Sequence, residues 1–162
     1  MTLIIGSLPT EIGQLTNAVI LNFEYNNFIG AIPTEVGRLT NLVELLLFVN
    51  DFRSTIPSEI GLLTALTILD LSQNSLHGKI PTQFGNLIRL QELYLEGNRL
   101  NGNGIPIELA QLTELAVLAL YDNALTGFIP KEVCTIPASN NNQLTVDCNE
   151  VVCSCCNCDE ST

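Results

Sequence analysis

The chain contains 162 residues, of which 46% are hydrophobic and 14% are charged, and its formal net charge at pH 7 is -11. This excess of negative charge argues against binding to nucleic acid or to anionic membrane surfaces, which attract basic proteins. The sequence has no run of about 18 uninterrupted apolar residues, so we expect no membrane-spanning segment and no membrane contact.

One period runs along the chain. Prolines recur at intervals of 24 or 25 residues, at Pro9, Pro33, Pro57, Pro81, Pro106 and Pro130, and asparagines keep the same period at Asn26, Asn50, Asn74, Asn98 and Asn123. A fixed period of this size predicts a stack of one small structural unit, in which each unit contacts only its neighbours. In such a solenoid we expect function to lie on an exposed surface rather than in a catalytic pocket.

The first predicted element is an incomplete unit. Gly6 and Pro9 occupy the positions that Gly30 and Pro33 fill one period later, so the chain opens in the middle of a unit. Solenoids need polar caps at their ends, and the pattern shows none before this unit. We therefore expect a fragment of a longer protein, or a chain that starts uncapped. Self-association is expected through the apolar residues at this end, which are Leu3, Ile4 and Ile5.

Five full units follow, and each begins with leucines that lead to the asparagine. In the unit of Asn74, Leu69 and Leu71 lie two residues apart, so both point to the inner face of a short strand. Stacked strands of this kind form a parallel sheet. The asparagine ends the strand, where its side-chain amide satisfies turn backbone groups that would otherwise be unpaired in the core. A sixth, degenerate turn extends this asparagine ladder to Asn149.

After the asparagine, the unit continues with a Gly-x-Ile-Pro block, as at residues 30–33, 78–81 and 127–130. The L-x-x-L-x-L-x-x-N-x-L pattern followed by this block resembles the plant-type leucine-rich repeat, whose familiar members are receptor-kinase ectodomains and polygalacturonase-inhibiting proteins. The resemblance covers roughly residues 2–136. It implies an α/β repeat solenoid, a curved right-handed superhelix with a parallel concave β-sheet and short helical or 3-10 segments on the convex side.

The block departs from the pattern in two places. Ser54 replaces the glycine in one unit, and Asn103 and Gly104 add one residue in another, so we expect any second, convex-side sheet to be irregular. A glutamate follows most block prolines by two residues, where a short helical turn is expected to start and a carboxylate complements the helix dipole. We expect a structural role for this column, which comprises Glu11, Glu35, Glu59, Glu108 and Glu132.

All six cysteines lie in the last 29 residues, at Cys134, Cys148, Cys153, Cys155, Cys156 and Cys158. We favour a disulfide-stapled cap formed in an oxidising compartment, with a connectivity that the sequence does not choose. A zinc or other thiolate site is the alternative, but the C-x-C-C-x-C spacing lacks paired C-x-x-C knuckles. We expect a solenoid over residues 1–149, a Cys-rich cap over residues 150–162, and neither a metal nor a cofactor. The tail also resembles the ends of diatom leucine-rich repeat proteins, which implies an extracellular or membrane-anchored protein.

Residues that flank the inward-pointing pair in each strand are expected to point out of the concave sheet into solvent. They combine carboxylates with aromatic and aliphatic side chains, without any lysine or arginine, and such a face suits a cationic peptide or amine. The alternative is that strands favour aromatic residues and that acids keep the surface soluble. The candidate ligand-binding residues are Glu24, Glu44, Leu46, Phe48, Asp70, Glu92, Tyr94, Glu96, Tyr121 and Asp122.

These observations favour a recognition module, the ectodomain fragment of a receptor-like or secreted protein that binds a peptide, protein or glycan outside the cell. Resemblance to polygalacturonase inhibitors makes an inhibitor of a secreted glycosidase the alternative. Ice binding ranks lower, because no concave column repeats one small polar residue. An enzyme also ranks lower, because no serine or cysteine nucleophile lies beside a base and His77 is off the concave columns.

Overall fold

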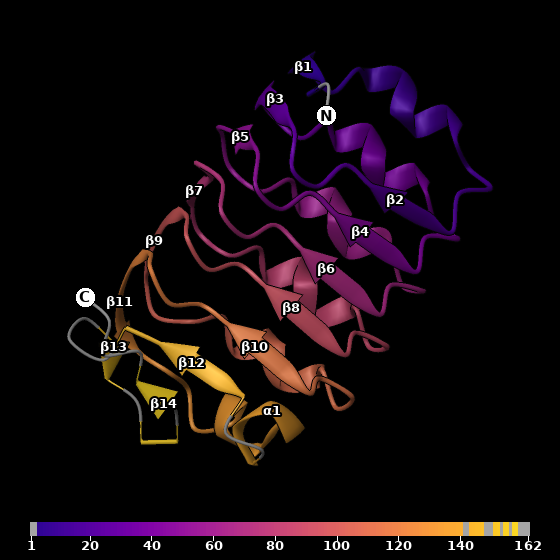
Figure 1. Cartoon of the computed structure of the whole chain (residues 1–162). Helices are drawn as coiled ribbons and strands as arrows, with labels where there is room; N and C mark the ends of the chain where they lie inside the picture. Colours follow the sequence, from indigo (N-terminus) through magenta and orange to yellow (C-terminus); the bar gives the residue numbers. More distant parts are fainter. Residues whose placement is uncertain (1–2, 141–142, 148–150, 153, 156, 159–162) are drawn as a thin grey trace.

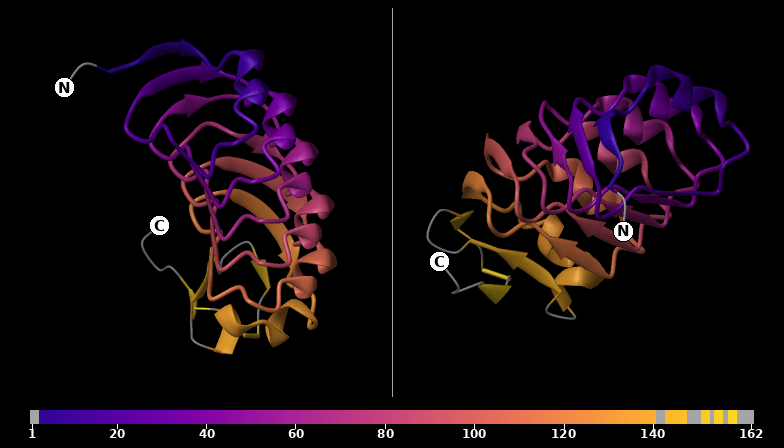
Figure 2. Two further views of the ribbon diagram at one scale, coloured as in Figure 1. Left: turned by 90° about the vertical axis from the view of Figure 1, so that its right-hand side faces the viewer. Right: turned by 45° about the horizontal axis from the view of Figure 1, so that its top comes forward.

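The structure is a computed structural model of the whole chain, and it describes residues 3–140, 143–147, 151–152, 154–155 and 157–158. It is a curved stack of turns whose strands lie side by side along the molecule (Figure 1). A parallel sheet lines the concave side, and short helices line up along the outer edge, as the left view of Figure 2 shows. This is the repeat solenoid that the sequence period predicts.

The concave sheet has seven parallel strands within the described residues, in the order β14-β12-β10-β8-β6-β4-β2. In β6, Leu69 is fully buried between the half-buried Ile68 and Asp70, so alternate side chains point into the core and out of the sheet. The strands are β2 (Ile20–Asn22), β4 (Glu44–Leu46), β6 (Ile68–Asp70), β8 (Glu92–Tyr94), β10 (Val117–Ala119), β12 (Leu144–Val146) and β14 (Asn157–Cys158).

The second sheet is divided into two pieces. One holds β1 (Ile5–Ser7), β3 (Asn27–Gly30) and β5 (Asp51–Phe52), and the other holds β7 (His77–Gly78), β9 (Arg99–Asn103), β11 (Ala124–Phe128) and β13 (Val151–Val152). At the break, Thr55 makes an isolated parallel bridge to His77. Ser54 has a φ of 155°, whereas Gly30 and Gly78 at the same position have values of 81° and 82°. The backbone at the serine therefore differs from that of the two glycines, although its φ is still positive, and the sheet breaks beside it.

Short helices form where the prolines predict them. In η1 to η5 the proline directly precedes the helix, and its carbonyl accepts the first backbone hydrogen bond. In η2, for example, the Val36 N–H donates to the Pro33 carbonyl at 3.1 Å. The glutamate lies in the first turn of η1, η2, η3 and η5, near the positive end of the dipole. Within the described part of the chain, no helix has the length and apolar content to cross a bilayer. The helices are η1 (Thr10–Gln14), η2 (Thr34–Arg38), η3 (Ser58–Leu62), η4 (Thr82–Asn86), η5 (Ile107–Gln111), η6 (Val133–Thr135) and α1 (Pro137–Asn140).

The core is a continuous column of leucines with a stacked pair of rings. Leu45, Leu69 and Leu93 are fully buried, and each such side chain contributes about 1.5–3 kcal/mol to folding. Phe28 and Phe52 stack with ring centroids 5.9 Å apart. No unit buries its leucines alone, so the stability of each turn depends on its neighbours.

The asparagines join consecutive turns through hydrogen bonds. The Asn74 amide Nδ2 donates to the carbonyls of Leu47, Leu71 and Ser72 at 3.0–3.2 Å, and its Oδ1 accepts from the Phe52 backbone N–H at 3.1 Å. One side chain thus satisfies backbone groups in two successive turns. Asn50, Asn98 and Asn123 repeat the arrangement. The predicted last member, Asn149, lies outside the described residues.

Candidate ligand-binding face

The concave sheet presents the candidate side chains because its strands are in register. Glu44, Ile68, Glu92 and Val117 form one row across neighbouring strands, and Leu46, Asp70, Tyr94 and Ala119 form the next row. All ten candidate residues lie in these strands or in the loop that directly follows each strand. The six basic residues of the chain lie elsewhere, at Arg38, Arg53, Lys79, Arg89, Arg99 and Lys131.

The structure brings together four of the candidates on β6, on β8 and just beyond β8. We call Asp70, Glu92, Tyr94 and Glu96 the acidic zone. The Tyr94 hydroxyl donates a hydrogen bond to the Glu92 carboxylate at 3.0 Å, and Asp70 accepts bonds from the backbone and side chain of Ser72 at 2.9 and 2.6 Å. Burial, followed by the bond to Glu92, raises the pKa of Tyr94 to about 12. Tyr94 therefore remains a neutral donor across the physiological range.

Glu96 has the most perturbed carboxyl of the face. Burial, with a smaller contribution from the charge of Asp70, raises its pKa to about 7, and burial also raises the pKa of Asp70. The Oε2 atom of Glu96 is buried and has no hydrogen-bond partner among the described residues. The sequence led us to expect this side chain to face solvent, and the structure instead encloses part of it. Enclosure of this oxygen away from water favours the neutral, protonated form of Glu96.

Apolar side chains gather next to the acidic zone, on β4 and the loops that follow β2 and β4. We call Tyr25, Leu46, Phe48 and Val49 the apolar zone. The rings of Tyr25 and Phe48 meet edge to face with centroids 5.0 Å apart, and Tyr25 is 55% exposed. Leu46, Phe48 and Val49 are half-buried, so part of each remains accessible to a partner.

The remaining candidates lie around these two zones. Glu24 and Glu44 are half-buried beside the apolar zone, Tyr121 is half-buried beyond the acidic zone, and Asp122 is exposed. Tyr25 and Val49 were not among the sequence candidates. Both directly precede a ladder asparagine, and their φ values are 52° and 53°. Gln73, Gly97 and Asp122 at equivalent positions also have a positive φ. The sequence pattern already placed the residue before each asparagine in a column on the concave side, although it did not single out Tyr25 and Val49 as ligand-binding residues.

Asp147 belongs to the same columns but has a different role. Its carboxylate accepts the backbone N–H groups of Asp122 at 2.8 Å and Asn123 at 3.1 Å. In earlier turns the equivalent N–H groups bond to backbone carbonyls of the next turn, as Gln73 does to Glu96. The aspartate therefore ends a ladder of backbone hydrogen bonds, and we do not include it in the binding face.

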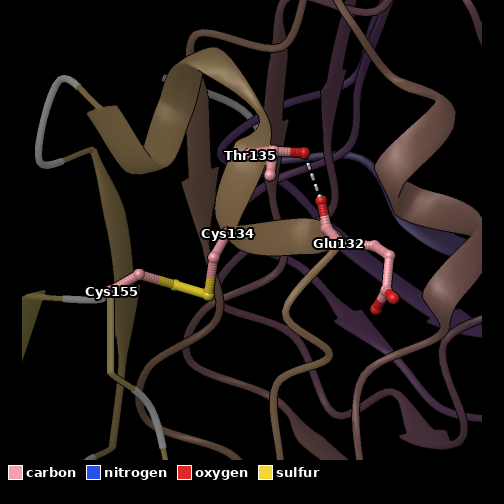
Figure 3. The surroundings of a disulfide bond; sticks show 4 residues. All are labelled: Glu132, Cys134, Thr135 and Cys155. Carbon is pink, nitrogen blue, oxygen red and sulfur yellow. Dashed lines mark hydrogen bonds between the residues drawn. A yellow bond between two sulfur atoms is a disulfide. The ribbon is translucent and has the colours of Figure 1, made fainter.

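One disulfide joins the last helical turn to the cysteine tail. Cys134 bonds to Cys155 across 21 residues, with the Cα atoms 5.7 Å apart (Figure 3). Beside it, the Thr135 hydroxyl donates to the carbonyl of Glu132 at 2.6 Å. Of the other predicted disulfide cysteines, Cys158 lies in β14, and Cys148, Cys153 and Cys156 lie outside the described residues. In the described ranges, no group of three or more His, Cys, Asp and Glu residues is arranged to hold a metal ion.

A hollow of about 540 Å³ lies away from the concave sheet, beside the break in the second sheet. Ser54, Thr55, Ile56 and Lys79 contribute to its lining. The hollow contains no cluster of perturbed carboxyls, and it shares no residue with the acidic or apolar zone. The charged and aromatic residues of the candidate set therefore lie on the concave sheet and not in this hollow.

Comparisons with known proteins place the chain among leucine-rich repeat structures. Family models described as "Leucine rich repeat" and "Leucine Rich Repeat" match residues 55–100 and 89–112. No curated protein sequence gives a significant match. The plant peptide hormone receptor RGFR1, solved in complex with RGF2, is 38% identical to this chain, with a TM-score of 0.80 over 94% of this chain and 23% of that one.

Two further solved structures are also similar. The ectodomain of the Arabidopsis thaliana membrane receptor kinase GASSHO1/SCHENGEN3, in complex with CASPARIAN STRIP INTEGRITY FACTOR 2, is 32% identical, with a TM-score of 0.81 over 92% of this chain and 17% of that one. A plant ice-binding protein is 32% identical, with a TM-score of 0.73 over 88% of this chain and 44% of that one. The chain thus spans less than half the length of each of these three proteins.

Proposed function

We propose that this chain, a leucine-rich repeat protein of the plant type, is a recognition module that binds a peptide or protein on its concave face outside the cell. One observation carries the proposal. The concave sheet gathers accessible aromatic residues and carboxylates, and all six basic residues lie elsewhere on the chain. The similar receptor ectodomains support an extracellular or cell-surface location and a protein partner, since RGFR1 is a peptide hormone receptor.

The charge of the face defines a finer proposal, that the partner is cationic. The buried Oε2 of Glu96 lacks a donor among the described residues, and the neighbouring carboxylates of Asp70 and Glu92 add negative potential. An ammonium or guanidinium group supplies donors and charge together. The module performs no chemical step in this proposal, because an open sheet excludes water poorly and the similar receptors are binding ectodomains.

Two other functions remain as rivals. An inhibitor of a secreted glycosidase would also use the concave face. The similarity to a plant ice-binding protein keeps ice binding as a candidate. The concave columns argue against ice binding, since Leu46, Asp70 and Tyr94 are consecutive in one row and match no repeating lattice.

A panel of basic, neutral and acidic peptides of equal length tests the proposal by isothermal titration. We expect only the basic peptides to bind, and more weakly as salt rises, because charges are screened beyond about 8–10 Å near physiological ionic strength. Joint replacement Glu92→Lys and Glu96→Lys should abolish this preference, and Tyr94→Ala should weaken binding. Glu35→Lys on the outer edge is the matched control. Equal binding of all three peptide classes, or a silent Tyr94→Ala, would refute the proposal.

A further inference from the structure

The apolar zone and the acidic zone are directly adjacent on the concave face. Leu46 of β4 pairs with Asp70 of β6, which pairs with Tyr94 of β8. Beyond the strands, the Val49 N–H donates to the Ser72 carbonyl at 3.2 Å, and the Gln73 N–H donates to the Glu96 carbonyl at 2.9 Å. These bonds hold Phe48, Ser72 and Glu96 in one column. The surface therefore changes from apolar to acidic across one strand spacing, about 4.8 Å.

The apolar zone keeps an unfavourable backbone conformation at Val49. Its φ is 53°, which costs about 1–2 kcal/mol for a residue with a side chain, and Val is β-branched. Gly97 has a φ of 65° at the same position two turns later, so the turn itself does not need valine. The half-buried Val49 follows Phe48 directly in the chain and adds apolar area to the zone that holds the paired rings of Tyr25 and Phe48.

The acidic zone favours a charged group of a partner, whereas the apolar zone favours an apolar group. Its carboxylates receive hydrogen bonds from Ser72 and Tyr94, yet Glu96 Oε2 is buried and has no partner within the described residues. The charged group that acts on Glu96 from an adjoining strand is Asp70, which is acidic, and Glu92, Asp70 and Glu96 all act on the neutral Tyr94. A ligand group that brings both donors and positive charge complements the acidic zone.

Building on the proposed function, we infer that the face selects a two-part ligand: a peptide with an aromatic or aliphatic side chain over the apolar zone and a lysine or arginine over the acidic zone. Phe48 and Glu96 lie two strand spacings apart, so the two groups of the ligand must be separated by about 10 Å. In a polyproline II peptide, residues three apart point to the same side and are separated by about 9.3 Å. The ligand therefore carries its apolar and cationic residues at positions i and i+3.

A spacer series tests this spacing. The probes are Ac-Gly-Phe-(Pro)n-Lys-Gly-NH2 peptides with zero to four prolines, measured by isothermal titration or by NMR shift changes. We expect the affinity to be highest with two prolines and to fall about tenfold with one or three. We also expect a loss of about tenfold when Phe is replaced by Ala, or Lys by norleucine, in the best peptide.

Double-mutant cycles between peptide and protein identify which zone of the protein contacts which side chain of the peptide. Tyr25→Ala should remove the benefit of the peptide Phe, and Glu96→Gln should remove the benefit of the peptide Lys, with no coupling between the crossed pairs. Leu62→Ala and Glu35→Gln on the outer edge are the controls, because both positions lie away from the concave sheet. Both concave replacements are at accessible or shape-preserving positions, so folding is maintained and is checked by circular dichroism.

The outcomes separate the two proposals. If cationic peptides bind equally well with and without Phe, or at every spacer length, the two-part inference is wrong and the cationic recognition module stands. If no basic peptide binds at millimolar concentration, both proposals fail. If binding follows the spacer but responds to Leu62→Ala rather than Tyr25→Ala, the ligand lies on another surface and the inference is overturned.

Discussion

The two ends of the described solenoid differ in how far their apolar residues are covered. At the N-terminal end, Leu3, Ile4 and Ile5 are 48%, 53% and 76% exposed, and Leu15 and Ile20 are also exposed. At the C-terminal end, Val152 is exposed, but most apolar residues are buried; these are Val133, Ile136, Ala138, Leu144, Val146 and Val151. A stack of identical turns therefore has no intrinsic way to close, and each end needs specific residues to do so.

The C-terminal end is closed by replacing what a further turn would supply. Asp147 accepts the backbone N–H groups that would bond to the next turn, and the Ala138 N–H bonds to the Leu115 carbonyl at 2.8 Å. In the first four turns the column of Cys134 holds glycine, because a Cβ at Gly37, for example, would lie 2.6 Å from the Glu59 carbonyl of the next turn, and Ala110 occupies the column in the fifth turn. Cys134 ends the column, and its side chain instead bonds to Cys155 of the tail.

The largest expected effect comes from removing this disulfide. The double replacement Cys134→Ser and Cys155→Ser should lower the free energy of unfolding by about 2–4 kcal/mol, because it releases a closed loop in the unfolded chain. Urea unfolding measures the loss, and amide hydrogen exchange should locate it in the last turns. Thr40→Ser with Thr64→Ser, both at exposed positions, is the matched control. An equal loss of protection in β2 and β4 would contradict a closure that acts locally.

Replacing a ladder asparagine gives the next largest expected loss of stability, and the loss should differ between the middle and the N-terminal end of the stack. The Asn74 amide donates to its own turn and also to Leu47 of the preceding turn. The Asn26 amide donates only within its own turn, to Phe23 and Glu24, although its Oδ1 accepts from Ile4. Asn74→Ala should cost about 2–3 kcal/mol and Asn26→Ala about 1 kcal/mol, since fewer buried groups lose partners. Thermal unfolding compares them, with the exposed Asn17→Ala as a near-silent control. Equal shifts for all three would refute the ladder.

A change of pH should act on the middle of the sheet rather than on either end. The pKa of Glu96 is about 7 in the folded protein and has a reference value of 4.5, so the folded state binds the proton more tightly. Its contribution to stability is therefore fully present below about pH 4.5 and is lost as the pH rises to about 7. Glu96→Gln should stabilise the protein by about 1–2 kcal/mol at pH 8, after allowance for solvent screening, and by less at pH 5. A gain of equal size at both pH values would argue against this assignment.

The smallest change in stability is expected at the open end. Ile5→Glu should alter the free energy of unfolding by less than about 0.5 kcal/mol, because the side chain is already exposed. If the N-terminal end self-associates, the same replacement should shift a concentration-dependent sedimentation profile toward monomer, and Leu62→Glu on η3 should not. A wild-type protein that stays monomeric at high concentration would refute self-association through this end.

Several features of the fold follow from local pattern alone. The leucine spacing, the ladder asparagines and the prolines before each helix define the solenoid without knowledge of long-range contacts, because each unit packs only against its neighbours. The irregular second sheet was also predictable, since Ser54 stands where the backbone of the neighbouring turns needs glycine. The division at residue 150 and the full set of cysteine pairings stay predictions.

The sequence by itself determined the stack, its concave side and the acidic character of that side, because these depend on periodicity and on which columns lack basic residues. The tertiary structure was needed to find that Glu96 is partly enclosed, that Asp147 accepts backbone N–H groups of the turn before it, and that the rings of Tyr25 and Phe48 contact each other. Burial and hydrogen bonding at one residue depend on side chains from turns about 24 residues away. A column pattern identifies those neighbours but does not fix how closely they pack.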